Sequence, residues 1–302
     1  DQQRFWQCRT IDGAAQAEVD PQPAPQMLPV DGSKAKRFAS GMVTVSFSIP
    51  YRTDGVYGNS FSGVGLVVDA DRGLVLVDRD TVPVGLGDAS VIFSESVEIP
   101  AKVFALHPTH NLALVQYEPS AVAGLTVHPV VFDGRDLSRG DKATLVGMTV
   151  YDRFESEDLK VSNVGGLAMA TPVVPMFQQR NLDLVQLGSR TRPFVGGVIA
   201  DKKGRASAFW TSIPDLSSES GDNWWRGVPG KVVNEFLRDP SGADSLGVEW
   251  GVESVLAAQR RGLSPQWVQR AAASGDDAPQ ILEVRRVTKG GAADGLLRPG
   301  DL

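Results

Sequence analysis

Short runs of alternating hydrophobic and polar residues fill the middle of the chain. Residues 42–49 alternate with a period of two, which is the period of a strand with one buried face. Similar β-rich runs follow at 65–68, 73–77, 90–93, 101–106, 112–117, 143–146, 182–187, 198–200 and 206–210. Glycine, proline and aspartate separate these runs, as turn residues do. Many short strands joined by turns predict an all-β barrel or sandwich rather than a parallel α/β sheet.

The two ends of the chain differ from this middle region. Residues 1–38 show little alternation and are rich in proline, which predicts an extended linker or the tail of a preceding module. Residues 229–238 carry their apolar side chains on one face, which predicts a helix at the end of a first domain that spans 39–240. The last part, 245–302, mixes strand and helix patterns and predicts a second, smaller α+β domain.

Composition limits the chemistry. With 302 residues, of which 42% are hydrophobic, the chain can bury two cores. The 30 basic and 36 acidic residues give a net charge of −6, which argues against a nucleic-acid partner. Cys8 is the single cysteine and His107, His110 and His128 are the only histidines, so metal ligands and imidazole bases are scarce. No apolar run approaches the roughly 18 residues that span a bilayer.

Several motifs occur in the order that a known family has. Residues 61–69 (FSGVGLVVD) with 73–82 (GLVLVDRDTV), then 107–115 (HPTHNLALV) and 193–204 (PFVGGVIADKKG), resemble the segments that carry the histidine, the aspartate and the serine of the chymotrypsin-like domain in Deg/HtrA proteases. The resemblance is greatest to the degenerate second protease-like domain of the large branch of this family in plants and fungi. It implies a chymotrypsin-like double β-barrel.

The resemblance also implies where the catalytic residues would stand, and all three are substituted. Asp80 occupies the histidine position, Asn111 the aspartate position and Val195 the serine position. A carboxyl group with a pKa of about 4 does not shuttle protons near neutral pH as an imidazole does. An amide supplies no charge to stabilise an imidazolium, and valine has no nucleophilic atom. We therefore expect this segment to be catalytically inactive.

Other sites are conceivable from the residues alone. A rebuilt catalytic site would pair His110 with Ser62 or Ser189, and a metal site would use the three histidines, although turn and strand positions explain these residues more simply. Gly196 and Gly197 would build the oxyanion hole of an active enzyme, but a tight turn with positive φ also requires glycine. We favour the turn, and we predict neither a metal nor a cofactor.

The C-terminal part carries a second resemblance. Residues 245–250 (SLGVEW) and 290–302 (GGAADGLLRPGDL) resemble the carboxylate-binding loop and the late signature of the circularly permuted PDZ domain of Deg/HtrA proteins. The resemblance implies a partial PDZ domain in which Leu246, Gly247 and Val248 receive the C-terminal carboxylate of a peptide. A PDZ fold that serves only as a packed spacer is the alternative.

These features predict a pseudoprotease and PDZ segment of a longer, ATP-independent Deg/HtrA-type serine protease whose active sites lie elsewhere. The expected roles are scaffolding, oligomerisation or the binding of unfolded proteins and C-terminal peptides. A structural component without proteolysis and a serine endopeptidase with a rebuilt site are the alternatives. Family analogy suggests a homo-oligomer in the chloroplast or the nucleus. Trp224 and Trp225 either form an interface hot spot or, as we favour, anchor the helix at 229–238 on the second barrel.

Overall fold

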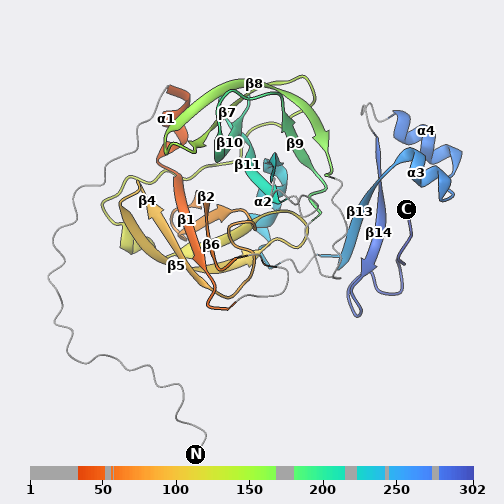
Figure 1. Ribbon diagram of the computed structural model, residues 1–302, viewed down its shortest axis with the longest axis horizontal. Coiled ribbons are helices and arrows are strands. Elements are labelled where there is room, and N and C mark those ends of the chain that lie inside the picture. The colour runs from red at the N-terminus through yellow and green to blue at the C-terminus, as the bar shows by residue number, and fades with distance from the viewer. Residues whose placement is uncertain are drawn as a thin grey trace, which may run out of the picture.

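The computed structural model describes residues 33–51, 56, 58–167, 180–214, 223–241, 245–273 and 279–302. Strands dominate these residues and form two closed barrels of antiparallel strands, beside which lies a two-stranded sheet with two helices (Figure 1). The predicted all-β class and the double barrel that the family resemblance implies are both confirmed.

The first barrel closes in the strand order β1-β2-β3-β6-β5-β4. Its strands are β1 Met42–Ser48, β2 Ser60–Asp69, β3 Leu74–Val77, β4 Asp88–Phe93, β5 Val97–Leu106 and β6 Ala113–Tyr117, and a 3-10 turn η1 follows at Pro119–Val122. Alternation along β1 gives the barrel an inner and an outer face, because Val45 and Phe47 are fully buried while the serines beside Phe47 are not. Each strand run predicted in this region lies largely on an observed strand.

The second barrel closes in the order β10-β11-β12-β9-β8-β7. Its strands are β7 Lys142–Thr149, β8 Phe154–Gly165, β9 Leu184–Leu187, β10 Phe194–Ala200, β11 Ala206–Pro214 and β12 Asn223–Pro229. The sequence pattern missed β8 and β12. β8 is mostly charged and polar, and only Phe154 and Val161 are buried. β12 contains Gly227 and Pro229, which are residues that usually signal a turn.

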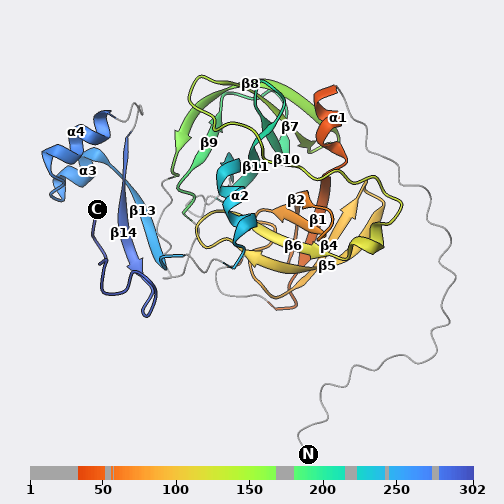
Figure 2. The same ribbon diagram turned by 180° about the vertical axis from the view of Figure 1, so that it is seen from behind.

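Two helices pack against the barrels. The linker prediction is wrong for residues 33–38, which lie in helix α1 (Ser33–Ala39): Ala35 and Phe38 are three positions apart on one face and are buried. Residues 1–32, and Cys8 with them, lie outside the described residues. Helix α2 (Gly230–Arg238) confirms the predicted helix, and Figure 2 shows it across the region where the barrels meet.

One hydrophobic core extends from the first barrel into the second. It contains Leu66 and Leu76 of the first barrel, Val198 and Phe209 of the second, and Phe236 of α2, all of which are nearly inaccessible to solvent. Because these apolar side chains are buried against one another, the two barrels form one packed unit. Polar groups at the junction are therefore buried as well and need partners across it.

The C-terminal part consists of β13 Val248–Ser254, α3 Val255–Arg260, α4 Pro265–Ala273 and β14 Gln280–Val287. The two strands pair antiparallel over a small core of Val248, Val284 and Ala293. A buried ion pair between Arg180 and Glu249 connects this part to the second barrel. The elements agree with an α+β module, and the assignment to the PDZ fold stays a prediction. Among the described helices, none is both long enough and apolar enough to cross a bilayer.

Candidate functional site

A cleft of about 540 Å³ lies between the barrels, and it is lined by two of the three residues that we predicted to replace the catalytic residues of the family. Asp80 enters the cleft from the loop after β3, and Val195 enters it from β10 of the other barrel. Ser212 of β11 lines the same cleft. The fold therefore brings together positions that are more than a hundred residues apart in sequence, at the place where the barrel cores meet.

Asp80 is engaged across the barrel junction. The hydroxyl of Ser212 donates a hydrogen bond to Oδ2 of Asp80 at 2.8 Å. Burial raises the pKa of Asp80, and the bond from Ser212 acts in the opposite direction. An ionised carboxylate there accepts this bond, whereas no imidazole stands in its place to take a proton from a nucleophile.

Asp78, two residues earlier, makes a parallel connection. The hydroxyl of Thr211 donates to Oδ2 of Asp78 at 2.5 Å, and the backbone N–H of Thr81 donates to Oδ1 at 2.7 Å. Burial, together with the charge of Asp80, raises the pKa of Asp78 to about 6. Asp78 and Asp80 thus bind consecutive hydroxyl residues of the second barrel.

Asn111, the third position, is fully buried behind the cleft. Its Nδ2 donates to the backbone carbonyl of Ser212 at 2.6 Å, and its Oδ1 accepts the backbone N–H of Arg79 at 3.0 Å. Its own N–H donates to Oδ1 of Asn181 at 2.7 Å. The amide of Asn111 can make both bonds because it donates and accepts, whereas an ionised carboxylate only accepts.

Val195 occupies a bulge of β10. The pairing of β10 with β7 shifts between Phe194 and Gly196, which leaves Val195 as the extra residue. Its half-buried side chain packs against the core shared by the barrels. No atom of this side chain can attack a carbonyl.

The turn that we favoured for the two glycines after Val195 is wrong. Gly196 and Gly197 both lie within β10, with φ of 157° and 151°. A Cβ on Gly196 would stand 2.4 Å from Cβ of Val64 in the first barrel, and one on Gly197 would stand 2.1 Å from the carbonyl oxygen of Val146. Close approach of backbone to its neighbours requires glycine at these positions.

His107 and His110 are held as neutral hydrogen-bond acceptors. Nδ1 of His107 accepts the backbone N–H groups of Thr109 and His110 at 3.0 Å, and Nε2 of His110 accepts that of Asp183 at 3.3 Å. Burial lowers the pKa of His107 to about 3 and that of His110 to about 4.

The alternative sites gain no support in the described part of the chain. His110 forms no hydrogen bond there with Ser62, which lines the cleft, or with Ser189, which lies at another cavity. His128 bonds Ser40 elsewhere. Among the residues that the structure describes, no group of three His, Cys, Asp or Glu side chains is placed to hold a metal ion.

Sequence reasoning missed the partners of Asp78, Asp80 and Asn111. These are Asn181, Thr211 and Ser212. A signal existed for two of them, because Thr211 and Ser212 are adjacent hydroxyl residues in a mostly apolar strand, and buried hydroxyls need partners.

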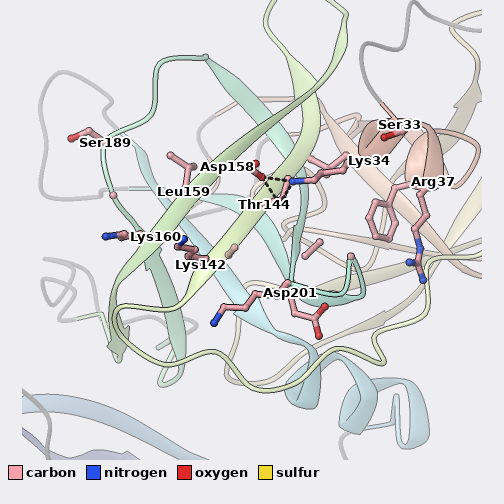
Figure 3. Close-up of a pocket in the computed structure, with 17 residues that line it drawn as sticks. Ser33, Lys34, Arg37, Lys142, Thr144, Asp158, Leu159, Lys160, Ser189 and Asp201 are labelled. Carbon is pink, nitrogen blue, oxygen red and sulfur yellow. Dashed lines mark hydrogen bonds and ion pairs between the residues drawn. The ribbon is translucent and has the colours of Figure 1, made fainter.

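Another cavity, of about 770 Å³, lies away from this cleft (Figure 3). It is lined by α1, β7 and β8, and Lys34 of α1 reaches Asp158 at 2.6 Å and Thr144 at 3.2 Å. Ser189 lies at its edge, near Lys160. None of the three substituted positions lines it.

The predicted peptide-binding residues face the barrels. Leu246 and Val248 line a cavity of about 480 Å³ together with His107, Phe236 and Trp250. Gly247 between them has φ of 66°, its carbonyl accepts the N–H of Thr288 at 2.8 Å, and its own N–H donates to Oγ of Ser245 at 3.2 Å. Glycine is suited to this left-handed conformation.

Curated relatives match most of the chain. Pro-apoptotic serine protease NMA111 of Eremothecium gossypii is 31% identical over 271 residues, which are 86% of this chain and 27% of the relative. The protein of that name in Yarrowia lipolytica is 31% identical over 300 residues, which are 94% of this chain and 30% of the relative. This chain thus spans less than a third of the length of these relatives. No family model matches it.

Solved structures show the same fold. HtrA-type protease AlgW with a decapeptide has a TM-score of 0.52 at 19% identity and covers 88% of this chain and 82% of its own. The same protease with a tripeptide has a TM-score of 0.53 at 19% identity, over 89% of this chain and 80% of its own. The double barrel and the sequence relation over most of its length identify the chain as a member of the HtrA (Deg) family of serine proteases.

Proposed function

We propose that this segment is a catalytically inactive protease-like domain of an HtrA-type serine protease, and that it supports the assembly and client binding of a longer protein whose active sites lie elsewhere. The observation that carries this proposal is the tether at the barrel junction. Asp80 and Asn111, which stand where the family has histidine and aspartate, both bind Ser212, one through its hydroxyl and the other through its carbonyl. Two positions that serve catalysis in an active enzyme of the family thus contribute here to the contact between the two barrels.

The chemistry of the cleft supports this proposal. A serine protease needs a nucleophile, an imidazole and a carboxylate in hydrogen-bond contact. Loss of the serine nucleophile alone lowers turnover by about a million-fold in such enzymes. Val195 lacks the hydroxyl, and both histidines near the junction are locked as neutral acceptors with strongly lowered pKa values.

A direct test uses the 302-residue chain with a fluorophosphonate probe and with casein. We expect no labelling and no inhibitor-sensitive hydrolysis, and trypsin in the same assay verifies the probe. Labelling that disappears in Ser62→Ala or Ser189→Ala would instead establish a rebuilt site and refute the proposal.

We also propose that the C-terminal module binds the free C-terminus of extended peptides at residues 246–248. Leu246 and Val248 supply an apolar wall to the cavity of about 480 Å³ there. The solved AlgW structures contain a decapeptide and a tripeptide, which is consistent with peptide binding by a relative.

The peptide test compares one peptide with a free and with an amidated C-terminus in a fluorescence-polarisation titration of the whole chain. The free carboxylate should bind at least about tenfold more tightly, and Leu246→Asp should abolish the difference through charge repulsion. Equal affinity for both peptides would refute recognition of the C-terminal carboxylate and would support the alternative, in which the module is a packed spacer. Sedimentation analysis of the same sample tests the proposed homo-oligomer.

A further inference from the structure

A cavity of about 640 Å³ on the second barrel gathers an unusual set of side chains. It lies against β9, β11 and β12 and the loop before β10. We call it the Trp–Arg cavity after the side chains that dominate its lining, which are Trp210, Trp224, Trp225, Arg190, Arg192 and Arg226. The proposed absence of protease activity neither requires nor uses this cavity.

Tryptophan rings hold two of the arginines by stacking. Trp210, which is 1% exposed, stacks on Trp225 with ring centroids 6.4 Å apart. The guanidinium of Arg190 lies 4.8 Å from the ring of Trp210, and that of Arg226 lies 5.3 Å from the ring of Trp224. A stacked guanidinium keeps its N–H edge available for an acceptor in the ring plane. Trp225 packs against the core of the second barrel that contains Trp210, and the predicted role of Trp224 and Trp225 as anchors of α2 stays a prediction.

The positive charge of the Trp–Arg cavity is incompletely balanced. Arg192 pairs with Glu155 at 2.7 Å, whereas Arg190 and Arg226 form no ion pair among the described residues. Burial lowers the pKa of Arg226, and the nearby charge of Arg190 lowers it further. None of the described lining residues is acidic. The charge of Glu157 raises the pKa of Arg190, against the larger effect of burial, which lowers it. The two neighbouring, partly buried cations still repel each other, and an anion bound between them would relieve this repulsion.

Two buried donors at the Trp–Arg cavity also lack an acceptor. Nε1 of Trp210 and Nη1 of Arg190 have no hydrogen-bond partner in the part of the chain that the structure describes. Buried polar groups are almost always paired, and those that are not call for an explanation such as a missing ligand. The other polar groups of the lining include the amides of Gln186 and Asn223, which can also donate.

We propose that the Trp–Arg cavity binds an oxyanion, either a carboxylate or a phosphate monoester, between Arg190 and Arg226. Guanidinium groups bind both anions through paired N–H donors, which a point charge does not provide. Trp224, which is 41% exposed, offers a ring face for an aromatic or apolar group attached to the anion. The volume of the cavity accommodates such a group in addition to the anion.

Two sources of the anion are possible: a separate molecule, or a carboxylate side chain of this protein. Asp215, Glu219 and Asp222 precede β12 in the sequence and lie outside the described residues. An external oxyanion is the occupant that we propose. These three carboxylates are the alternative source, and the experiment separates the two.

Intrinsic fluorescence provides the readout, because three of the six tryptophans of the chain line the Trp–Arg cavity. The 302-residue protein is titrated with phenyl phosphate, benzoate, inorganic phosphate and, as a neutral control, phenol. We expect a saturable change with phenyl phosphate and benzoate, weaker binding of inorganic phosphate because it cannot stack, and none with phenol. Calorimetry checks the stoichiometry of one.

Arg190→Gln and Arg226→Gln should each weaken phenyl phosphate binding at least about tenfold, whereas Arg260→Gln, on α3 of the C-terminal module, should leave it unchanged. Arg226→Gln should keep the melting temperature of the parent, since it removes a repulsion, so the loss of binding is not a loss of folding. Binding that stays within about twofold of the parent in both cavity variants, or equal binding of phenol, would overturn the proposal.

A variant with Asp215→Asn, Glu219→Gln and Asp222→Asn identifies the source of the anion. Unchanged affinity for phenyl phosphate supports an external ligand alone. Tighter binding shows that the chain's own carboxylates compete for the same arginines, which supports the site and assigns them as its resting occupant. Absence of binding in both the parent and this variant refutes the site.

Discussion

The hydroxyl of Ser212 donates to the carboxylate of Asp80 at 2.8 Å, and the two residues come from different barrels. The neighbouring pair, Thr211 and Asp78, repeats this relationship at 2.5 Å. Two adjacent hydroxyl–carboxylate bonds thus connect the two barrels at the place where the sequence motifs predict the substituted catalytic positions.

Removing the first of these bonds should destabilise the fold. For Ser212→Ala we expect a loss of about 1–2 kcal/mol in the free energy of unfolding, because a partly buried carboxylate loses a charge-assisted partner. Urea denaturation followed by circular dichroism measures it. Ser189→Ala is the matched control, since this exposed hydroxyl has no such partner across the junction. Equal stability of both variants would show that the bond between Ser212 and Asp80 contributes nothing.

Restoring a carboxylate at Asn111 should weaken the protein rather than repair an enzyme. Asn111→Asp replaces the donor to the carbonyl of Ser212 by an oxygen and buries a charge, which costs about 3–5 kcal/mol at neutral pH. Burial raises the pKa of the new carboxyl group, so the deficit should shrink as the pH falls and this group becomes a donor. Urea denaturation at about pH 5 and about pH 7 measures this dependence, with Asn59→Asp as an exposed control. A deficit that stays constant with pH would contradict the account.

Asp78 gives a second dependence on pH. Its folded pKa of about 6 lies above the ordinary value of 3.8, so its stabilising contribution is complete below pH 3.8 and is lost as the pH rises through 6. Relative to the parent, Asp78→Asn should therefore gain up to about 3 kcal/mol of stability between about pH 4 and about pH 7. Unfolding free energies of both proteins across this range provide the measurement.

His107 and His110 change the stability with pH in the opposite direction, and they do so equally in the parent and in this variant. Their folded pKa values of about 3 and 4 lie below 6.5, so the stability they provide is present above pH 6.5 and is lost as the pH falls. The difference between Asp78→Asn and the parent cancels their effect. A difference that does not change with pH would mean that the pKa of Asp78 is not raised.

Gly196 is expected to tolerate no side chain. Gly196→Ala places a Cβ 2.4 Å from Cβ of Val64, and we expect a loss of about 2–4 kcal/mol from overpacking at the junction. Gly124→Ala is the control, because Gly124 also has positive φ, at 102°, but has open space around it. Val64→Gly in the same chain removes this Cβ and should recover part of the loss, and an additive result in the double variant would rule out this contact.

The sequence was sufficient for the strands with one clean apolar face and insufficient for those without one. Residues 42–49 alternate and contain β1, whereas β8 consists mostly of charged and polar residues, buries only Phe154 and Val161, and was missed. The glycines of β10 predicted a turn because their neighbours in space, Val64 and Val146, are invisible in a local pattern.

The candidate site likewise contains residues that the sequence could predict and residues that it could not. The positions Asp80, Asn111 and Val195 could be named from local motifs, because each motif is a continuous stretch of chain. The partners of Asn111 could not, since Asn181 lies 70 positions away and Ser212 lies 101 positions away. Such pairs exist only once both barrels have closed, and closure depends on strand order and register rather than on local composition.

Helix α1 has a consequence for the order in which the chain folds. It precedes the first barrel in the sequence but packs on β7 and β8 of the second, where Lys34 meets Asp158, 124 positions later. A helix of seven residues is not stable by itself in water. During synthesis α1 therefore stays unstructured until most of the second barrel has left the ribosome, so it docks after the strands of both barrels have been made, although it precedes them in the sequence.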